Sequence, residues 1–139
     1  MKILFLCVAN SARSQMAEGL ARSLFDPGIS VASAGSAPSR VNPFAIRAML
    51  NAGIDISHQR SKTIDEALTP DVDLIITLCA EEVCPVVPGK TKKEHWPLPD
   101  PAAKTGSDEE ILAAFEYTLT QIKNRLVELG QQRGLLSAD

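Results

Sequence analysis

The chain has 139 residues, 45% of them hydrophobic, and a formal net charge of −3. This length suits a single core, so we expect residues 1–139 to form one domain. The basic residues are scattered apart from the small group Lys90, Lys92 and Lys93, which argues against a nucleic-acid partner. No apolar stretch approaches membrane-spanning length, so no membrane association is expected.

The cysteine count points to a reducing compartment. The apolar run before Cys7 is too short for a signal peptide, and Phe5 and Leu6 stand where a cleavage site would need small residues. Three cysteines without an export signal predict a cytoplasmic protein, in which thiols are more often catalytic than structural.

Predicted strands and helices alternate along the chain. Short apolar runs predict strands at 2–6, at 29–34, and at 72 and 74–78, and a further short strand is expected near 93–96 within an irregular, proline-rich segment. Apolar spacings of three and four residues predict helices from 14 to 24, from 42 to 53, from 63 to 68 and from 107 to 130. The expected N-caps are Ser14, Asn42, Thr63 and Ser107, and Gly130 is the expected end of the last helix.

This order of elements predicts a doubly wound α/β fold, a three-layer sandwich around a small four-stranded parallel sheet. Ligands of such folds bind beyond the carboxyl ends of the strands, near the point where the strand order reverses. Cys7, Cys79 and Asp100 each follow a predicted strand. We therefore expect these three residues on the same rim of the sheet.

The segment between the first strand and the first helix has the features of an oxyanion-binding loop. Loop amides and the helix N-terminus favour a bound anion, and the guanidinium of Arg13 can bind two oxygens of a phosphate-like ion. A cysteine at a helix N-terminus beside arginine commonly has a lowered pKa, so Cys7 is the expected nucleophile. Asn10 is the residue best suited to a left-handed conformation. The predicted oxyanion-binding residues are Val8, Ala9, Asn10, Ser11, Ala12, Arg13 and Ser14.

The alternative for this loop is a buried cysteine at a strand end and a surface arginine, because five residues between Cys and Arg occur often by chance. The capped amphipathic helix that follows favours the anion loop. Asp100, in Pro99-Asp100-Pro101, is the candidate general acid for a leaving oxygen; the alternative is a simple turn aspartate.

The other two cysteines, Cys79 and Cys84, leave three interpretations open. A zinc site would need His58 and His95 at no familiar spacing, so no metal is expected, and no cofactor either. Two unreactive cysteines are the second possibility. The interpretation we favour is a relay, in which Cys79 attacks an adduct on Cys7 to form a disulfide, and Cys84 then exchanges to give Cys79-Cys84.

Motifs along nearly the whole chain resemble the arsenate reductases built on the low-molecular-weight tyrosine phosphatase fold. The motifs that carry the resemblance are Cys7 to Gly19, Ser33-Ala34-Gly35, Asn42-Pro43, Gly53-Ile54-Asp55-Ile56-Ser57, Thr77-Leu78-Cys79, Cys84-Pro85, Glu94-His95-Trp96 and Asp100-Pro101-Ala102.

The resemblance implies reduction of arsenate to arsenite, with phosphate and sulfate as competing oxyanions. It implies Cys7 as nucleophile, Arg13 and Ser14 as oxyanion ligands, Asp100 as acid, and Cys79 and Cys84 as the disulfide shuttle. Thioredoxin is the implied reductant, in preference to glutaredoxin. The four residues between Cys79 and Cys84 make a shorter spacing than is familiar in this family.

Some members of the family bind potassium near the loop asparagine. Lys62 stands at the corresponding position of this chain, so that ion is not expected here, although Asn10, Glu18 and Ser33 remain. A phosphotyrosine phosphatase is the alternative enzyme, but such enzymes usually carry an aromatic residue where this chain has Ala102. A non-enzymatic arsenic or redox sensor is the third possibility.

Overall fold

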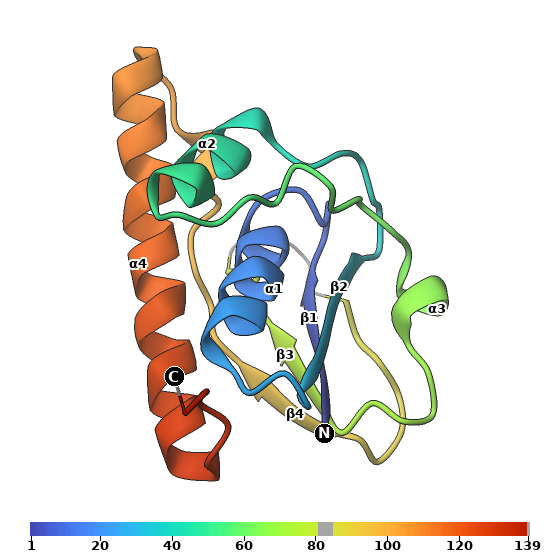
Figure 1. The fold of residues 1–139 in the computed structure, drawn as a ribbon. Helices are drawn as coiled ribbons and strands as arrows, with labels where there is room; N and C mark the ends of the chain where they lie inside the picture. Colours follow the sequence, from blue (N-terminus) through green and yellow to red (C-terminus); the bar gives the residue numbers. More distant parts are fainter. Residues whose placement is uncertain (81–84, 139) are drawn as a thin grey trace.

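The computed structural model describes residues 1–80 and 85–138 and contains one parallel sheet flanked by helices (Figure 1). The strand order is β2-β1-β3-β4, and every neighbouring pair is parallel. The strands are β1 (Lys2–Cys7), β2 (Ser30–Gly35), β3 (Leu74–Thr77) and β4 (Lys92–His95). The helices are α1 (Arg13–Leu24), α2 (Pro43–Asn51), α3 (Ile64–Ala67), the short 3-10 helix η1 (Pro101–Ala103) and α4 (Asp108–Arg133). The predicted four-stranded parallel α/β fold is confirmed.

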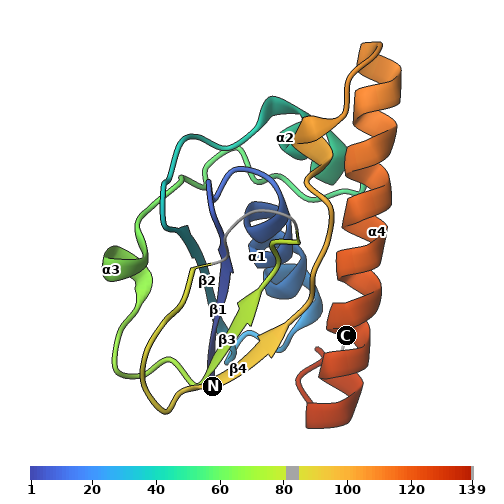
Figure 2. The same ribbon diagram turned by 180° about the vertical axis from the view of Figure 1, so that it is seen from behind.

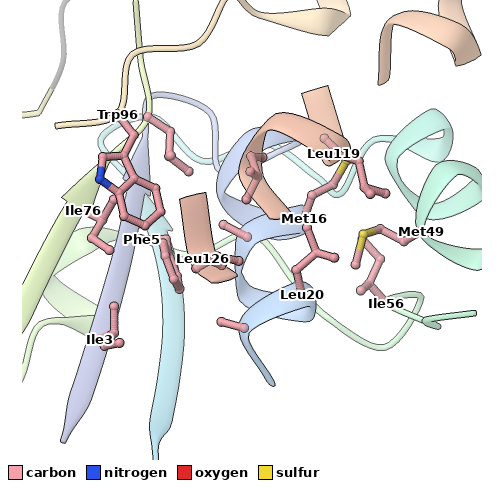
Figure 3. Close-up of a cluster of buried hydrophobic side chains, with 14 of the residues drawn as sticks. Ile3, Phe5, Met16, Leu20, Met49, Ile56, Ile76, Trp96, Leu119 and Leu126 are labelled. Carbon is pink, nitrogen blue, oxygen red and sulfur yellow. The ribbon is translucent and has the colours of Figure 1, made fainter. Parts of the chain in front are cut away.

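Strand β1 is buried on both faces because its side chains alternate between two apolar clusters. Ile3 and Phe5 belong to the larger cluster, which contains side chains of α1, α2 and α4. Figure 3 shows Phe5 and Ile76 of the sheet in this cluster with Met16 and Leu20 of α1. This cluster fixes α1, and with it the loop that enters α1, against the sheet.

The opposite face of the sheet has a thinner cover. Leu4 and Leu6 pack there with Ile75, Val87 and Ala67, the last from the short helix α3. In Figure 2, which views the sheet from behind, α3 lies at the edge near β2, far from α4. The three predicted layers are therefore present, but the third consists of α3 and loop segments.

Two predicted helix ends are wrong. The N-cap of α1 is Ala12, without a side-chain hydrogen bond, and Ser14 lies inside the first turn, where its hydroxyl contacts Cys7. Helix α4 continues past Gly130 to Arg133 and ends at Gly134, which has φ of 66°. Gly130 is a packing position: a Cβ there would lie 2.5 Å from Cδ2 of Leu136.

The other predicted caps are confirmed. Asn42 accepts a hydrogen bond from the Phe44 amide, with proline at the first turn of α2. Thr63 accepts from the Glu66 amide, and Ser107 forms a reciprocal capping box with Glu110. Residues 81–84, which include Cys84, are outside the described part of the chain.

Candidate active site

The candidate site lies at the carboxyl ends of β1, β3 and β4. Strand β1 has β2 on one side and β3 on the other, so the chain reverses its direction of winding at β1. Cys7 is the last residue of β1 and is 2% exposed. Its sulfur is a free thiol and lies 2.9 Å from the Ser14 hydroxyl. A ligand that reaches this rim therefore meets the Cys7 sulfur at the base of the loop.

The carbonyl oxygens of the 8–11 loop are held by hydrogen bonds from outside the loop. The amides of Ala37, Ser39 and Asn42 donate to the carbonyls of Val8, Ala9 and Ser11 respectively, at 2.9, 3.0 and 2.9 Å. Within one peptide unit the N–H points away from the C=O, so the amides that share these peptide units point away from the donors at residues 37, 39 and 42. Successive amides that point to one side can form an anion-binding concavity.

Asn10 has the left-handed conformation expected from the sequence, with φ of 47°. Its side chain is fully buried and donates through Nδ2 to the Ser14 hydroxyl at 2.8 Å. Since the Ser14 oxygen accepts this bond, its own proton can be donated to the Cys7 sulfur. Asn10 therefore orients Ser14 toward the thiol.

Arg13 joins the loop to the two strands on the other side of Cys7. Its side chain is 4% exposed, and its Nη1 atom donates to the carbonyl of Leu98 at 2.9 Å and to that of Leu78 at 3.5 Å. Leu78 follows β3 and Leu98 follows β4. The structure thus brings the loop arginine and the carboxyl ends of three strands together, which excludes the surface-arginine alternative.

Asp100 lies on this rim, with its Oδ2 atom 3.8 Å from Nη2 of Arg13. Its Oδ1 atom accepts a hydrogen bond from the Ala102 amide and caps η1. The side chain is 40% exposed, so the carboxyl group is open to solvent and can exchange protons with it. His95 is bonded to the Thr77 hydroxyl, and Trp96 is buried in the core.

Cys79 comes directly after Leu78, whose amide donates to the carbonyl of Leu6 at 2.9 Å. Its backbone therefore follows the strand adjacent to the one that carries Cys7. Cys79 is 1% exposed and is disulfide-bonded, whereas Cys7 is free. The third predicted thiol, Cys84, lies outside the described residues.

Gly35 is a site residue that sequence reasoning did not single out. It pairs with Cys7 across β1 and β2, and a Cβ at Gly35 would lie 2.3 Å from the Val8 carbonyl oxygen and 2.9 Å from the Asn10 nitrogen. Real Cβ atoms do not approach so closely, so the loop can occupy this position only against glycine. The only signal in the sequence is the turn Ser33-Ala34-Gly35, which does not by itself reveal the close approach.

Glu18, one turn into α1, carries a buried carboxylate close to the loop. It accepts a hydrogen bond from the Ser33 hydroxyl at 2.7 Å, and Lys62 Nζ and Arg22 Nη1 lie 3.6 and 3.0 Å from it. A lysine ammonium thus faces this carboxylate.

Across residues 1–80 and 85–138, no three His, Cys, Asp or Glu side chains are grouped to hold a metal ion. In the same ranges, none of the helices combines the length and apolarity that crossing a bilayer requires.

Comparison with known proteins identifies relatives over almost the whole chain. The family model of the low molecular weight phosphotyrosine protein phosphatases matches residues 2–134. An arsenate reductase of Bacillus subtilis is 44% identical over 131 residues, covering 93% of this chain and 94% of the relative. An arsenate reductase of Halalkalibacterium halodurans is 45% identical over 126 residues, covering 89% and 91%.

Solved structures of arsenate reductases also superimpose on this chain. An arsenate reductase in the phosphate binding state superimposes with a TM-score of 0.78 at 37% identity, over 94% of this chain and 97% of that one. The arsenate reductase of Archaeoglobus fulgidus gives 0.79 at 30% identity, over 91% and 97%. A thioredoxin-dependent arsenate reductase of Corynebacterium glutamicum gives 0.69 at 29% identity, over 94% of this chain and 60% of that one.

Proposed function

The chain belongs to the low molecular weight phosphotyrosine protein phosphatase family, and on that premise we propose that it reduces arsenate to arsenite. Two relatives named arsenate reductase, 44% and 45% identical to this chain, support this activity over a phosphatase activity. The observation that carries the proposal is the placement of a second cysteine, Cys79, just beyond the end of β3, the strand next to the one that ends in Cys7. The active unit is one domain comprising residues 1–139.

The first step is attack of the Cys7 thiolate on arsenic. The loop amides and the Arg13 guanidinium hold the arsenate oxygens, and phosphate and sulfate compete for the same donors. A sulfur–arsenic bond forms and an arsenic–oxygen bond breaks, with Asp100 giving its proton to the departing oxygen. The exposed Asp100 carboxyl then regains a proton from solvent.

The second step is the redox step. The Cys79 thiolate attacks the Cys7 sulfur, the sulfur–arsenic bond breaks, and its electron pair leaves with arsenic, which becomes arsenite. Cys7 and Cys79 are then a disulfide, having supplied two electrons together. Attack by Cys84 on Cys79 would transfer the disulfide to Cys79-Cys84 and release the Cys7 thiolate for another turnover.

A dithiol protein must then reduce the second disulfide, and we propose thioredoxin for this role. The similarity to a thioredoxin-dependent arsenate reductase supports this partner over glutaredoxin. We place the protein in a reducing, cytoplasmic compartment, where thiols that take part in a catalytic relay are kept reduced between turnovers. No cofactor or metal enters any of these steps.

A coupled assay tests the proposal. Purified protein is mixed with arsenate, thioredoxin, thioredoxin reductase and NADPH, and NADPH consumption is followed; a parallel mixture contains glutaredoxin and glutathione. We expect sustained, arsenate-dependent turnover in the thioredoxin mixture and none with the Cys7→Ser variant. Turnover only with glutathione would overturn the choice of reductant.

The match to the phosphatase family model gives a specific reason to test a phosphatase activity beside arsenate reduction. The same loop would bind a phosphate ester, and water could discharge the phosphocysteine. A low rate of aryl phosphate hydrolysis is expected, because Ala102 offers no aromatic surface beside the acid. Rapid hydrolysis of aryl phosphate together with no arsenate turnover in either mixture would make the phosphatase the function of this chain.

A further inference from the structure

The left-handed conformation of Asn10 depends on contacts from two sides. Ser61 donates through its hydroxyl to the Asn10 carbonyl at 2.6 Å, and the Lys62 amide donates to Asn10 Oδ1 at 3.0 Å. These contacts come from the segment before α3, far along the chain. A third donor comes from α1 itself, from the residue that follows Ser14.

This third donor is the carboxamide of Gln15, which is fully buried. Its Nε2 atom lies 3.0 Å from Asn10 Oδ1, 3.1 Å from the Asn10 carbonyl and 3.0 Å from the Arg60 carbonyl. One amide group therefore contacts both the backbone and the side chain of the left-handed residue. It also joins the loop to the segment that carries Ser61.

The orientation of Gln15 is fixed by a second carboxamide. Gln59 donates through Nε2 to Gln15 Oε1 at 2.8 Å and to the Gln15 carbonyl at 3.1 Å. Arg22 donates in turn to Gln59 Oε1 at 3.3 Å. Because Gln15 Oε1 faces this donor, its NH₂ group must face Asn10.

We propose that Gln15, held by Gln59, is a positioning residue for the nucleophile: it holds Asn10, which directs the Ser14 hydroxyl to the Cys7 sulfur. The path runs from Gln15 Nε2 to Asn10 Oδ1, from Asn10 Nδ2 to Ser14 Oγ at 2.8 Å, and from Ser14 Oγ to Cys7 Sγ at 2.9 Å. The inference rests on the proposed function, since it takes Cys7 as the nucleophile.

The test replaces Gln15 with methionine, which has nearly the same length but neither donates nor accepts as the carboxamide does. All variants carry Cys79→Ser and Cys84→Ser, so that Cys7 is the remaining cysteine. The rate of Cys7 alkylation by iodoacetamide is measured against pH, with and without inorganic phosphate. Arg13 and Asp100, the charged groups of the same rim, stay unchanged.

The expected result has two parts. In Gln15→Met we expect the pH of half-maximal alkylation to rise by about one unit and the phosphate concentration that protects half of Cys7 to rise about tenfold. The reason is that Asn10 no longer holds the Ser14 hydroxyl in place, so its hydrogen bond to the charged Cys7 thiolate weakens. Gln59→Met gives smaller changes in the same direction. Gln132→Met, at an exposed position of α4, changes neither quantity.

A purely structural role predicts another pattern. If Gln15→Met lowers the melting temperature but leaves the alkylation profile and phosphate protection unchanged, the inference is overturned. If Gln15→Met does not fold, Gln59→Met decides by the same two measurements. Neither measurement uses arsenate, so an absence of arsenate turnover in the parent protein would overturn the proposed function and leave this test valid.

Discussion

Arg13 and Asp100 face each other across the rim of the sheet, with 3.8 Å between Nη2 and Oδ2. Arg13 is 4% exposed and is also bonded to the Leu98 carbonyl, whereas Asp100 is 40% exposed. The arginine is therefore fixed by the protein, and the carboxyl group can exchange protons with water. This difference suits Arg13 as a fixed ligand for an anion and Asp100 as a proton donor.

Replacement of Asp100 by Asn tests the proton donor. The amide can still cap η1 but gives no proton to the leaving oxygen, so kcat should fall by about 10²-fold or more, with little change in KM for arsenate. The measurement is steady-state reduction in the coupled assay. Asp65→Asn, at an exposed position of α3, is the matched control and should retain the parent rate. An unchanged kcat in Asp100→Asn would remove Asp100 from the mechanism.

The Gly35→Ala substitution should displace the oxyanion loop by steric repulsion. The added Cβ would lie 2.3 Å from the Val8 carbonyl oxygen, so the loop must move, at a cost of about 1–3 kcal/mol in the free energy of unfolding. Phosphate binding at Cys7 should weaken with it. Gly28→Ala, whose Cβ would lie 3.3 Å from the Asp26 carboxylate, is the control and should bind phosphate normally. Normal phosphate binding by Gly35→Ala would contradict the steric argument.

The contrast between Asn10 and Gly35 shows what the sequence can reveal of this site. The left-handed residue was predictable, because the loop contains no glycine and asparagine tolerates positive φ best. The need for Gly35 comes from a strand pairing across the sheet, which periodicity in one segment does not reveal. The roles of Gln15 and Gln59 depend likewise on a contact over 44 residues of chain.

Local signals were reliable where the structure is local. The caps at Asn42 and Ser107 involve neighbours within three residues and were predicted correctly. Serine is a common N-cap, so the sequence predicts that role for Ser14. In the structure its hydroxyl contacts the Cys7 sulfur instead. Gly130 was misassigned as a helix end because a packing glycine and a terminating glycine look the same in sequence.

Lys62 should make the protein indifferent to potassium. Its ammonium lies 3.6 Å from the buried carboxylate of Glu18 and supplies a positive charge there. We expect equal arsenate reduction rates in potassium and sodium chloride at the same ionic strength. Severalfold activation of the parent protein by potassium would contradict this expectation.

The Lys62→Met variant should be less stable than the parent protein. Among the described contacts, the Glu18 carboxylate then keeps Arg22 as its one cationic partner. The free energy of unfolding should fall by about 1–3 kcal/mol. The backbone amide of Lys62 still bonds to Asn10 in this variant, so the loop keeps that contact. Chemical denaturation measures the change, with Lys123→Met on α4 as the control.

Glu110 should make the stability of α4 dependent on pH. Hydrogen bonds from the Ser107 backbone amide and then from its side chain lower the pKa of Glu110 below the usual value of a glutamate. A carboxyl group with a depressed pKa in the folded state stabilises it above the unfolded pKa, and this contribution is lost as the pH falls through the folded pKa. Glu110→Gln should therefore lower the melting temperature at pH 7, and the difference should shrink below about pH 4.5.

The control for Glu110 is Glu109→Gln, in the same helical turn but outside the capping box. It retains the three hydrogen bonds between Ser107 and Glu110, so its melting temperature should follow that of the parent protein across the whole pH range. A pH-independent loss of stability in Glu110→Gln would mean that the amide fails for steric reasons and that ionisation of Glu110 contributes nothing.

The relay predicts a single turnover when its last thiol is removed. In Cys84→Ser, Cys7 can still form the arsenic adduct and Cys79 can still attack it, so one arsenite per protein should be released. The Cys7-Cys79 disulfide then persists, because no neighbouring thiol exchanges with it. Arsenite release in a rapid-quench experiment and peptide mass spectrometry of the disulfide measure both outcomes.

Cys79→Ser separates the two steps of the relay. This variant should form the adduct on Cys7 and release no arsenite, since no thiolate attacks the Cys7 sulfur and the electron pair of the sulfur–arsenic bond is therefore not released to arsenic. Continuous turnover of Cys84→Ser with thioredoxin would show that thioredoxin attacks the Cys7-Cys79 disulfide directly. In that case Cys79, which is buried, would have to become accessible to thioredoxin during catalysis. Cys84 would then have no part in the transfer of electrons.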